Sequence, residues 1–236
     1  MIEGWLTSWQ AMPIAGVFVV AVVLHLAIYL AWGSAVAVSY WFLREKAHAG
    51  RVLDERPLFP SQLKSELLRG SLNCGVIAVV TVLCLELSDK PMSSGPMLAV
   101  ELLGLIALYE VTFYFLHRLL HTKPLHAIHG VHHKSVRTTP WSGLSVHPVE
   151  ALFIEAPILL FVLLAPVSVA ALVVFQVLLH YFSAVGHGNY DPFARLPGFG
   201  WLKSYTRMHQ LHHAHGTVNY STFSPLMDRA FRTHEP

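Results

Sequence analysis

The chain has 236 residues, of which 54% are hydrophobic and 13% are charged, and its formal net charge is only +2. Its apolar runs are too long for the core of a soluble domain, so they predict an integral membrane protein. The small net charge, and basic residues that form no patch interleaved with aromatic side chains, exclude nucleic acid as a partner. Cys74 and Cys84 lie in one apolar run, where thiols act as small hydrophobes, which excludes a cysteine-based metal site.

Four apolar runs predict the membrane-embedded elements. The first covers residues 11–43 and exceeds the ~20 residues that one span needs, so we expect it to be tilted. The runs at 67–87 and 97–115 predict two further spans. The run at 149–187 is interrupted by Pro166 and predicts a hairpin of two helices. The expected fold is an all-α membrane bundle of about three full spans plus this hairpin.

The distribution of basic residues predicts the orientation. Positively charged loops stay in the cytoplasm. If the chain crosses once at each of the first three runs and the hairpin returns to the side it left, every basic residue except Lys90 lies on one side. The polar segments at 117–148 and 188–236 lie on that side too. They hold the histidine motifs, so we expect a histidine-rich cap on the cytoplasmic face.

The chain contains 16 histidines, as many as Lys and Arg combined. His117 and His121 are four residues apart, so both imidazoles project from one face of a helix. Two interfacial histidines that interact with the dipole at a helix C-terminus explain this isolated pair equally well. A zinc-protease motif is excluded, because Arg118 stands where that motif has its glutamate base.

Two HxxHH motifs make a metal site the stronger interpretation. One spans residues 129–133 and the other 209–213. Positions i, i+3 and i+4 share one side of a helix, so each motif is expected to offer three imidazoles to a common centre. The eight histidines of the three motifs exceed the four positions of a tetrahedral zinc ion, and they suit two redox-active irons better.

The set HxxxH, HxxHH and HxxHH resembles the fatty acid hydroxylase and sterol desaturase superfamily of integral-membrane, non-haem di-iron oxygenases. The resemblance extends to three flanking segments. Residues 143–150 contain a His-Pro-x-Glu element, residues 186–190 a Gly-His-x-x-Tyr element, and residues 228–233 resemble the closing Asp-Arg-x-Phe-Gly-Thr. Arg232 stands where the family usually has glycine, and Met227 where tryptophan is common. These two departures affect the elements on the substrate side, whereas every motif histidine is present.

The resemblance implies metal ligands outside the three motifs. His187 and His147 match those positions, and His180, seven residues before His187 on the same helical face, is an alternative to His147 as the tenth ligand. The expected ligands are therefore His117, His121, His129, His132, His133, His147, His187, His209, His212 and His213. His25 lies inside an apolar run and is expected to bond a partner helix instead.

We expect the acidic residues near these histidines to differ in role. Glu150 and Asp191 each lie close to a candidate ligand and are expected to accept a hydrogen bond from an imidazole. Glu110 is seven residues before His117; an imidazole partner, a place beside a substrate channel and a helix–helix hydrogen bond remain equally open for it. Glu101 lies on the opposite helical face and is expected to be structural.

The resemblance implies an enzyme in which two ferrous ions and dioxygen oxidise a C–H bond of a lipid held in the bilayer, such as a sterol or fatty acyl chain. Hydroxylation and desaturation both remain open. Nothing here resembles a cytochrome b5 domain, a nucleotide fingerprint or a cysteine cluster, so the electrons are expected from a separate reductase, ferredoxin or cytochrome b5-like protein. The alternative is a metal-binding membrane protein or metal transporter without catalysis; the scattered polar residues of the spans argue against transport.

The domain organisation follows from the same elements. We expect a single membrane-embedded oxygenase domain over residues 1–236, with transmembrane helices at 1–116. The histidine-motif catalytic region then occupies 117–236 and includes the hairpin at 149–187.

The charge distribution yields a test of orientation. A reporter enzyme fused after Pro236 should be active in the cytoplasm, because the basic residues keep that face inside. Paired cytoplasmic and external reporters measure this directly. Activity only on the external face would contradict both the topology and a cytoplasmic electron donor.

Overall fold

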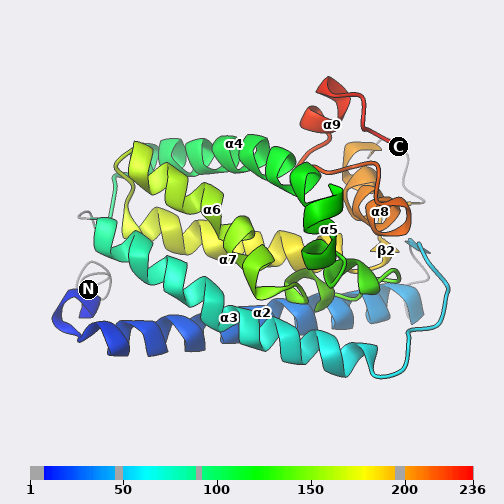
Figure 1. Ribbon diagram of the computed structural model, residues 1–236, viewed down its shortest axis with the longest axis horizontal. Coiled ribbons are helices and arrows are strands. Elements are labelled where there is room, and N and C mark those ends of the chain that lie inside the picture. Colours follow the sequence, from blue (N-terminus) through cyan, green and yellow to red (C-terminus); the bar gives the residue numbers. More distant parts are fainter. Residues whose placement is uncertain (1–7, 46–49, 89–91, 195–199, 236) are drawn as a thin grey trace.

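A computed structural model describes residues 8–45, 50–88, 92–194 and 200–235 (Figure 1). Among them, four helices are long and apolar enough to cross a membrane. They are α2 (Ile14–Glu45), α3 (Gln62–Leu87), α4 (Gly95–Leu120) and α7 (Val169–Gly186). The protein is therefore an all-α integral membrane protein, as its composition predicts.

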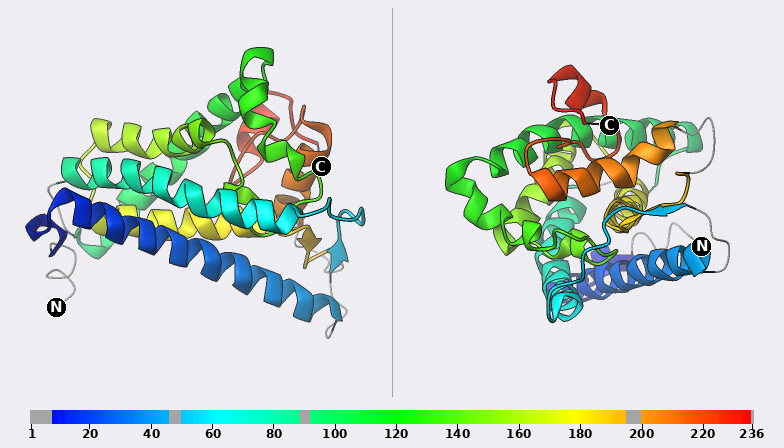
Figure 2. Two further views of the ribbon diagram at one scale, coloured as in Figure 1. Left: turned by 60° about the horizontal axis from the view of Figure 1, so that its bottom comes forward. Right: turned by 90° about the vertical axis from the view of Figure 1, so that its right-hand side faces the viewer.

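The long helices lie lengthwise beside one another, and their directions bring the histidine motifs to one end of the bundle (Figures 1 and 2). Helix α2 runs towards that end, α3 runs away from it and α4 returns to it. Helix α6 (Pro148–Leu164) leaves the same end, and α7 comes back after the turn at 165–168. The predicted hairpin and its turn at Pro166 are thereby confirmed.

Short elements form the cap at the histidine end (Figure 1). They are α5 (Lys123–His129), η2 (His132–Lys134), η3 (Ser142–Leu144), α8 (Gly200–His215), α9 (Leu226–Ala230) and the strands β1 (Arg51–Val52) and β2 (Tyr190–Asp191). The two strands pair antiparallel, so they tie the loop after α2 to the segment after α7. At the opposite end, η1 (Ser8–Ala11) precedes α2.

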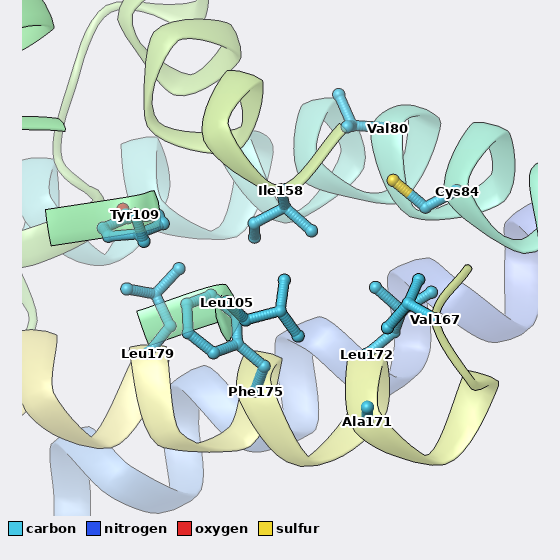
Figure 3. Packing of buried hydrophobic residues seen from close by; sticks show 10 residues of the cluster. All are labelled: Val80, Cys84, Leu105, Tyr109, Ile158, Val167, Ala171, Leu172, Phe175 and Leu179. Carbon is cyan, nitrogen blue, oxygen red and sulfur yellow. The ribbon is translucent and has the colours of Figure 1, made fainter. Parts of the chain in front are cut away.

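The core of the bundle lies between α3, α4, α6 and α7 (Figure 3). Leu105 and Tyr109 of α4 meet Phe175 and Leu179 of α7 there, and Ile158 of α6 closes the layer. The outward sides of the helices carry large apolar residues instead. Val23, Leu72 and Leu103 are 59%, 65% and 66% exposed. Such a surface suits contact with lipid chains, not water.

Buried polar side chains fix the cap to the bundle. Glu66 of α3 is fully buried and accepts hydrogen bonds from Gln62 Nε2 and Ser135 Oγ, each at 2.7 Å. Asn73, two turns further along α3, donates to the carbonyls of Leu144 and Val146 at 2.9 and 3.0 Å. The irregular chain between the first HxxHH motif and α6 is therefore held against α3.

Glu101 has the structural role that its helical face predicts. Its carboxylate accepts hydrogen bonds from Ser93 Oγ at 2.5 Å and from Ser168 Oγ at 2.6 Å. Ser168 is also the N-cap of α7, where its hydroxyl accepts from the backbone N–H of Ala171. Glu101 thus joins α4 to the start of α7 at the end of the bundle away from the histidines.

Two glycines of α3 allow a matched test of the packing between α2 and α3. A Cβ on Gly70 would lie 2.2 Å from the Tyr29 hydroxyl, which is buried and donates to the Trp141 carbonyl. A Cβ on Gly75 would meet nothing within 4 Å. Gly70→Ala should destabilise the protein by about 1–3 kcal/mol through overpacking.

Gly75→Ala is the control, and it should be neutral or stabilising by up to about 1 kcal/mol, because alanine favours helix. Thermal unfolding in detergent compares the two variants with the parent. Equal melting temperatures for both variants would contradict the tight contact at Tyr29.

Candidate metal centre

The described residues contain two groups of histidines whose ring nitrogens converge. Within each group, one ligand atom per residue lies within 4.8 Å of all the others. The five-histidine group consists of His117, His121, His129, His133 and His212, and the four-histidine group of His132, His187, His209 and His213. Nine of the ten expected ligands therefore lie in two adjoining clusters.

Each HxxHH motif serves both groups, so the prediction that each motif supplies one common centre is wrong. His129 and His133 enter the five-histidine group, while His132 between them enters the other. In the second motif the arrangement is reversed. His209 and His213 enter the four-histidine group and His212 enters the five-histidine group.

Helix geometry explains the division of the second motif. Residues i and i+4 differ by about 40° around a helix axis, whereas i+3 and i+4 differ by about 100°. The i, i+4 pair therefore shares one centre and the i+3 residue points to its neighbour. The second motif lies entirely in α8, but the first does not, because α5 ends at His129 and the next two histidines lie in the 3-10 turn η2.

The separations between ring nitrogens match those of ligands around a metal ion. The Nε2 atoms of His117 and His129 are 3.1 Å apart, and those of His187 and His209 are 2.7 Å apart. An ion that binds imidazole at ~2.1 Å places two ligands at right angles about 3.0 Å apart.

The Nδ1 partners orient the rings of His117 and His129 so that their Nε2 atoms face each other. His117 Nδ1 donates to the Tyr220 carbonyl at 2.8 Å, and His129 Nδ1 lies 2.7 Å from Glu150 Oε1. With Glu150 ionised, the single N–H of each neutral imidazole is on Nδ1, and both Nε2 atoms present lone pairs to each other. Two lone pairs at this separation repel unless a cation lies between them, which is the arrangement of metal ligands.

Other imidazoles of the two groups are oriented by backbone carbonyls. His212 Nδ1 donates to the Val218 carbonyl and His187 Nδ1 to the Ser183 carbonyl, both at 2.7 Å. Glu150 has the role that the sequence predicts, since it accepts from His129. The three backbone acceptors escaped the sequence analysis, because any residue type can supply a carbonyl.

The segment after α8 places two of these carbonyls. Asp228 is fully buried and accepts from the backbone N–H groups of Tyr220 and Ser221 at 2.8 and 2.9 Å, and from Thr233 Oγ1 at 2.7 Å. This gives a physical role to the Asp-Arg-x-Phe-x-Thr element noted in the sequence. It closes the loop that carries Tyr220, and thereby fixes the ring of His117.

Burial keeps the imidazoles of the cap neutral. Desolvation first, and neighbouring imidazoles second, hold the pKa of His132, His209, His212 and His213 well below the ordinary value. Burial also lowers the pKa of His187 to about 4. At neutral pH these side chains are in the form that binds a metal ion without first losing a proton.

Four side chains that the sequence analysis named as possible metal ligands or as partners of ligands lie outside both histidine groups. His147 is the N-cap of α6, where its Nδ1 accepts from the Val149 N–H, and it belongs to neither group. His180 belongs to neither group and donates from Nδ1 to the Gln176 carbonyl. Glu110 accepts from the backbone N–H groups of Phe223 and Ser224.

Glu110 therefore anchors the loop after α8, a role that the sequence analysis did not consider. Asp191 lies in β2, and its Oδ1 accepts from the backbone N–H of Phe193. The expected bond from an imidazole to Asp191 stays a prediction.

A cavity of about 80 Å³ borders both groups from the membrane side. His117 and His129 of one group and His132, His187 and His209 of the other line it. Its remaining wall is mostly apolar and includes Phe113, Leu116 and Leu179. An apolar molecule in this cavity would therefore reach both candidate metal positions.

Comparison with known proteins agrees with this geometry. The family model described as fatty acid hydroxylase matches residues 102–233, which is more than half of the chain. No solved structure matches the chain.

Three similar proteins come from plants and a yeast. Protein CER1-like 2 of Arabidopsis thaliana is 29% identical over 52% of this chain and 22% of its own length. The Delta(7)-sterol 5(6)-desaturase of Candida dubliniensis is 26% identical over 81% of this chain and 50% of its own length. The very-long-chain aldehyde decarbonylase GL1-5 of Oryza sativa subsp. indica is 30% identical over 55% and 23%. The chain thus spans half or less of the length of these relatives.

The split between the groups predicts metal contents. The parent protein should bind two ions per chain, because its nine imidazoles form two separate groups and each group offers enough nitrogen atoms for one ion. The double variant His209→Ala/His213→Ala should bind one, since it halves the four-histidine group and leaves the other complete. Elemental analysis of metallated protein in detergent measures this.

His215→Ala is the matched control from the same helix. His215 is exposed and its Nδ1 lies 3.3 Å from Glu235 Oε2, outside both groups, so its loss should leave two ions bound. At most one ion in the fully metallated parent would refute the two-site interpretation.

Proposed function

Because the chain belongs to the fatty acid hydroxylase family, we propose that it is a dioxygen-dependent di-iron enzyme that oxidises a C–H bond of a lipid. The observation that carries this proposal is the apolar cavity bordered by both histidine groups. An apolar cavity between membrane helices suits a lipid substrate, and nine imidazoles exceed the four positions of one tetrahedral zinc ion and suit two irons.

The residues would hold the ions by neutral imidazole nitrogens. The five-histidine group offers more donors than a tetrahedral ion takes, and the four-histidine group leaves room for a further ligand on iron. When bound, the irons supply the redox chemistry by which dioxygen attacks an unactivated C–H bond. Glu150 retains the Nδ1 proton of His129 and so keeps the Nε2 lone pair available.

The apolar wall of the cavity also keeps water away from the histidines. Phe113, Leu116 and Leu179 exclude water from the side of the histidines that faces the membrane. A dry cavity protects a reactive centre from side reactions and leaves the substrate to be positioned by shape.

The relatives include a sterol desaturase and a very-long-chain aldehyde decarbonylase. They support a lipid substrate here, and we propose hydroxylation or desaturation as the reaction. Desaturation would use the same centre and remove two hydrogens; product analysis distinguishes the two. His147 stays a proposal for a further ligand, reached only after movement of its ring.

We further propose that the histidine cap faces the cytoplasm and receives electrons there from a separate reductase, ferredoxin or cytochrome b5-like protein. The basic residues of the cap support this orientation, because positively charged loops are retained on that side.

Removal of one ligand from either group should abolish turnover. His132→Ala affects the four-histidine group and His212→Ala the five-histidine group. Each should lower lipid oxidation by more than about 100-fold, since even residues that only support ligands cost 10–100-fold. The measurement is dioxygen-dependent formation of oxidised lipid from a sterol and a long-chain acyl probe, with reduced electron donor supplied and bound iron determined.

Two controls separate lost chemistry from lost structure. His215→Ala lies outside both groups and should keep parental turnover. Glu101→Gln weakens hydrogen bonds far from the histidines, which are worth about 1–2 kcal/mol or less in membranes, and should affect stability more than turnover. Parental turnover by the His132 and His212 variants would end the oxygenase proposal.

A further inference from the structure

A second, larger cavity lies further along the bundle, away from the histidine cap. Its volume is about 350 Å³, and it lies between α2, α3, α6 and α7. Val20, Leu24 and Val173 line it and are 44%, 54% and 48% exposed. These apolar, exposed residues mean that this outer cavity opens sideways, towards the lipid chains of the membrane.

The outer cavity lies next to the inner one that borders the histidines. On α7, Leu172 and Gln176 line the outer cavity, and Leu179 and His180 line the inner one. On α6, Ile158 lines the outer cavity and Ile154 the inner one, and α3 follows the same order. One helical turn therefore separates the two cavities on each helix.

Four buried polar residues lie at the junction, and we call them the polar belt: His25, Glu155, Gln176 and His180. Each is at least 93% buried. Gln176 Nε2 donates to Glu155 Oε2 at 2.6 Å, and the rings of His25 and His180 stack with centroids 5.3 Å apart. Glu155 and His180 line the inner cavity, and His25 and Gln176 line the outer one.

Every member of the polar belt has one buried atom without a hydrogen-bond partner among the described residues. These atoms are His25 Nδ1, Glu155 Oε1, Gln176 Oε1 and His180 Nε2. Buried polar atoms are normally paired, and four unpaired ones in one place indicate a ligand that supplies the missing bonds. The histidine cap does not use these atoms, since none belongs to either histidine group.

The hydrogen-bonding pattern specifies the ligand group. His180 Nδ1 donates to the Gln176 carbonyl, so the free Nε2 of His180 is an acceptor. The amide nitrogen of Gln176 is directed at Glu155, so its free Oε1 is an acceptor too. His25 Nε2 lies 2.8 Å from Thr81 Oγ1, and His25 Nδ1 can act as donor or acceptor.

These free acceptors need a group that donates a hydrogen bond, which a hydroxyl does and which ethers, esters and aldehydes cannot do. We propose that the polar belt recognises the hydroxyl group of a lipid alcohol whose apolar body lies in the outer cavity. Only the part of the lipid next to the hydroxyl then enters the small inner cavity. The inference rests on the proposed function, and it places the carbon to be oxidised close to the hydroxyl.

Binding measurements test recognition apart from catalysis. The probes are radiolabelled cholesterol and its methyl ether, and 1-hexadecanol and its methyl ether, each titrated onto the detergent-solubilised protein. At least one alcohol should bind about tenfold more tightly than its ether, as one or two buried hydrogen bonds allow. A preference within the cholesterol pair would indicate a lipid with a ring system, and a preference within the hexadecanol pair would indicate a lipid with a linear chain. Equal binding within both pairs would overturn the proposal.

The double variant Glu155→Leu/Gln176→Leu removes both partners of one hydrogen bond, so it leaves neither one orphaned. It should bind alcohol and ether equally, with ether affinity unchanged. His180→Phe, which retains a ring beside His25, should also lose the preference and serves if the double variant does not fold. An undiminished preference in either folded variant contradicts the assignment.

Val173→Ala is the matched control, because Val173 lines the outer cavity without a polar atom. It should weaken alcohol and ether alike and leave their ratio unchanged. Metal content of two ions per chain in all variants shows that the cap is intact. Loss of turnover in the His132 variant with retained alcohol preference would separate the enzyme function from this recognition site.

Discussion

The structure depends on a constraint of the imidazole group, which carries one proton when neutral. With Glu150 ionised, His117 and His129 carry that proton on Nδ1, where a backbone carbonyl and Glu150 accept it, so the Nε2 atoms face each other as lone pairs. Burial keeps the rings of the cap uncharged. The arrangement repels itself until cations occupy it, so the fold around it has to hold the rings in place by other contacts.

Those contacts come from polar residues buried in an otherwise apolar bundle. Glu66 and Asn73 of α3 hold the chain between the first HxxHH motif and α6. Asp228 closes the loop that presents Tyr220 to His117. Membrane helices gain little from apolar contact with one another, because lipid is equally apolar, so hydrogen bonds of this kind carry much of the specificity.

Buried polar residues also lie between the histidine cap and the lipid chains of the membrane. The inner cavity touches both histidine groups, the polar belt lies at its far end and the outer cavity opens beyond it. In the proposed function, a substrate dissolved in the bilayer would approach the histidines from this apolar side and not from the aqueous face. Specificity in this arrangement comes from the few polar atoms along an apolar route, as it does in most small-molecule sites.

Run lengths predict the membrane class and the hairpin, charge predicts the common side of the histidine motifs, and i, i+4 spacing identifies eight of the nine histidines that converge, because these patterns act locally. His187 was added by the resemblance to a known family. Only the tertiary structure decided how each HxxHH motif is divided between two groups, and that His147 caps α6. It alone supplied the carbonyls of Tyr220, Val218 and Ser183, and the meeting of His25 with His180. These depend on backbone direction and on contacts between helices distant in sequence, and neither is encoded in residue type.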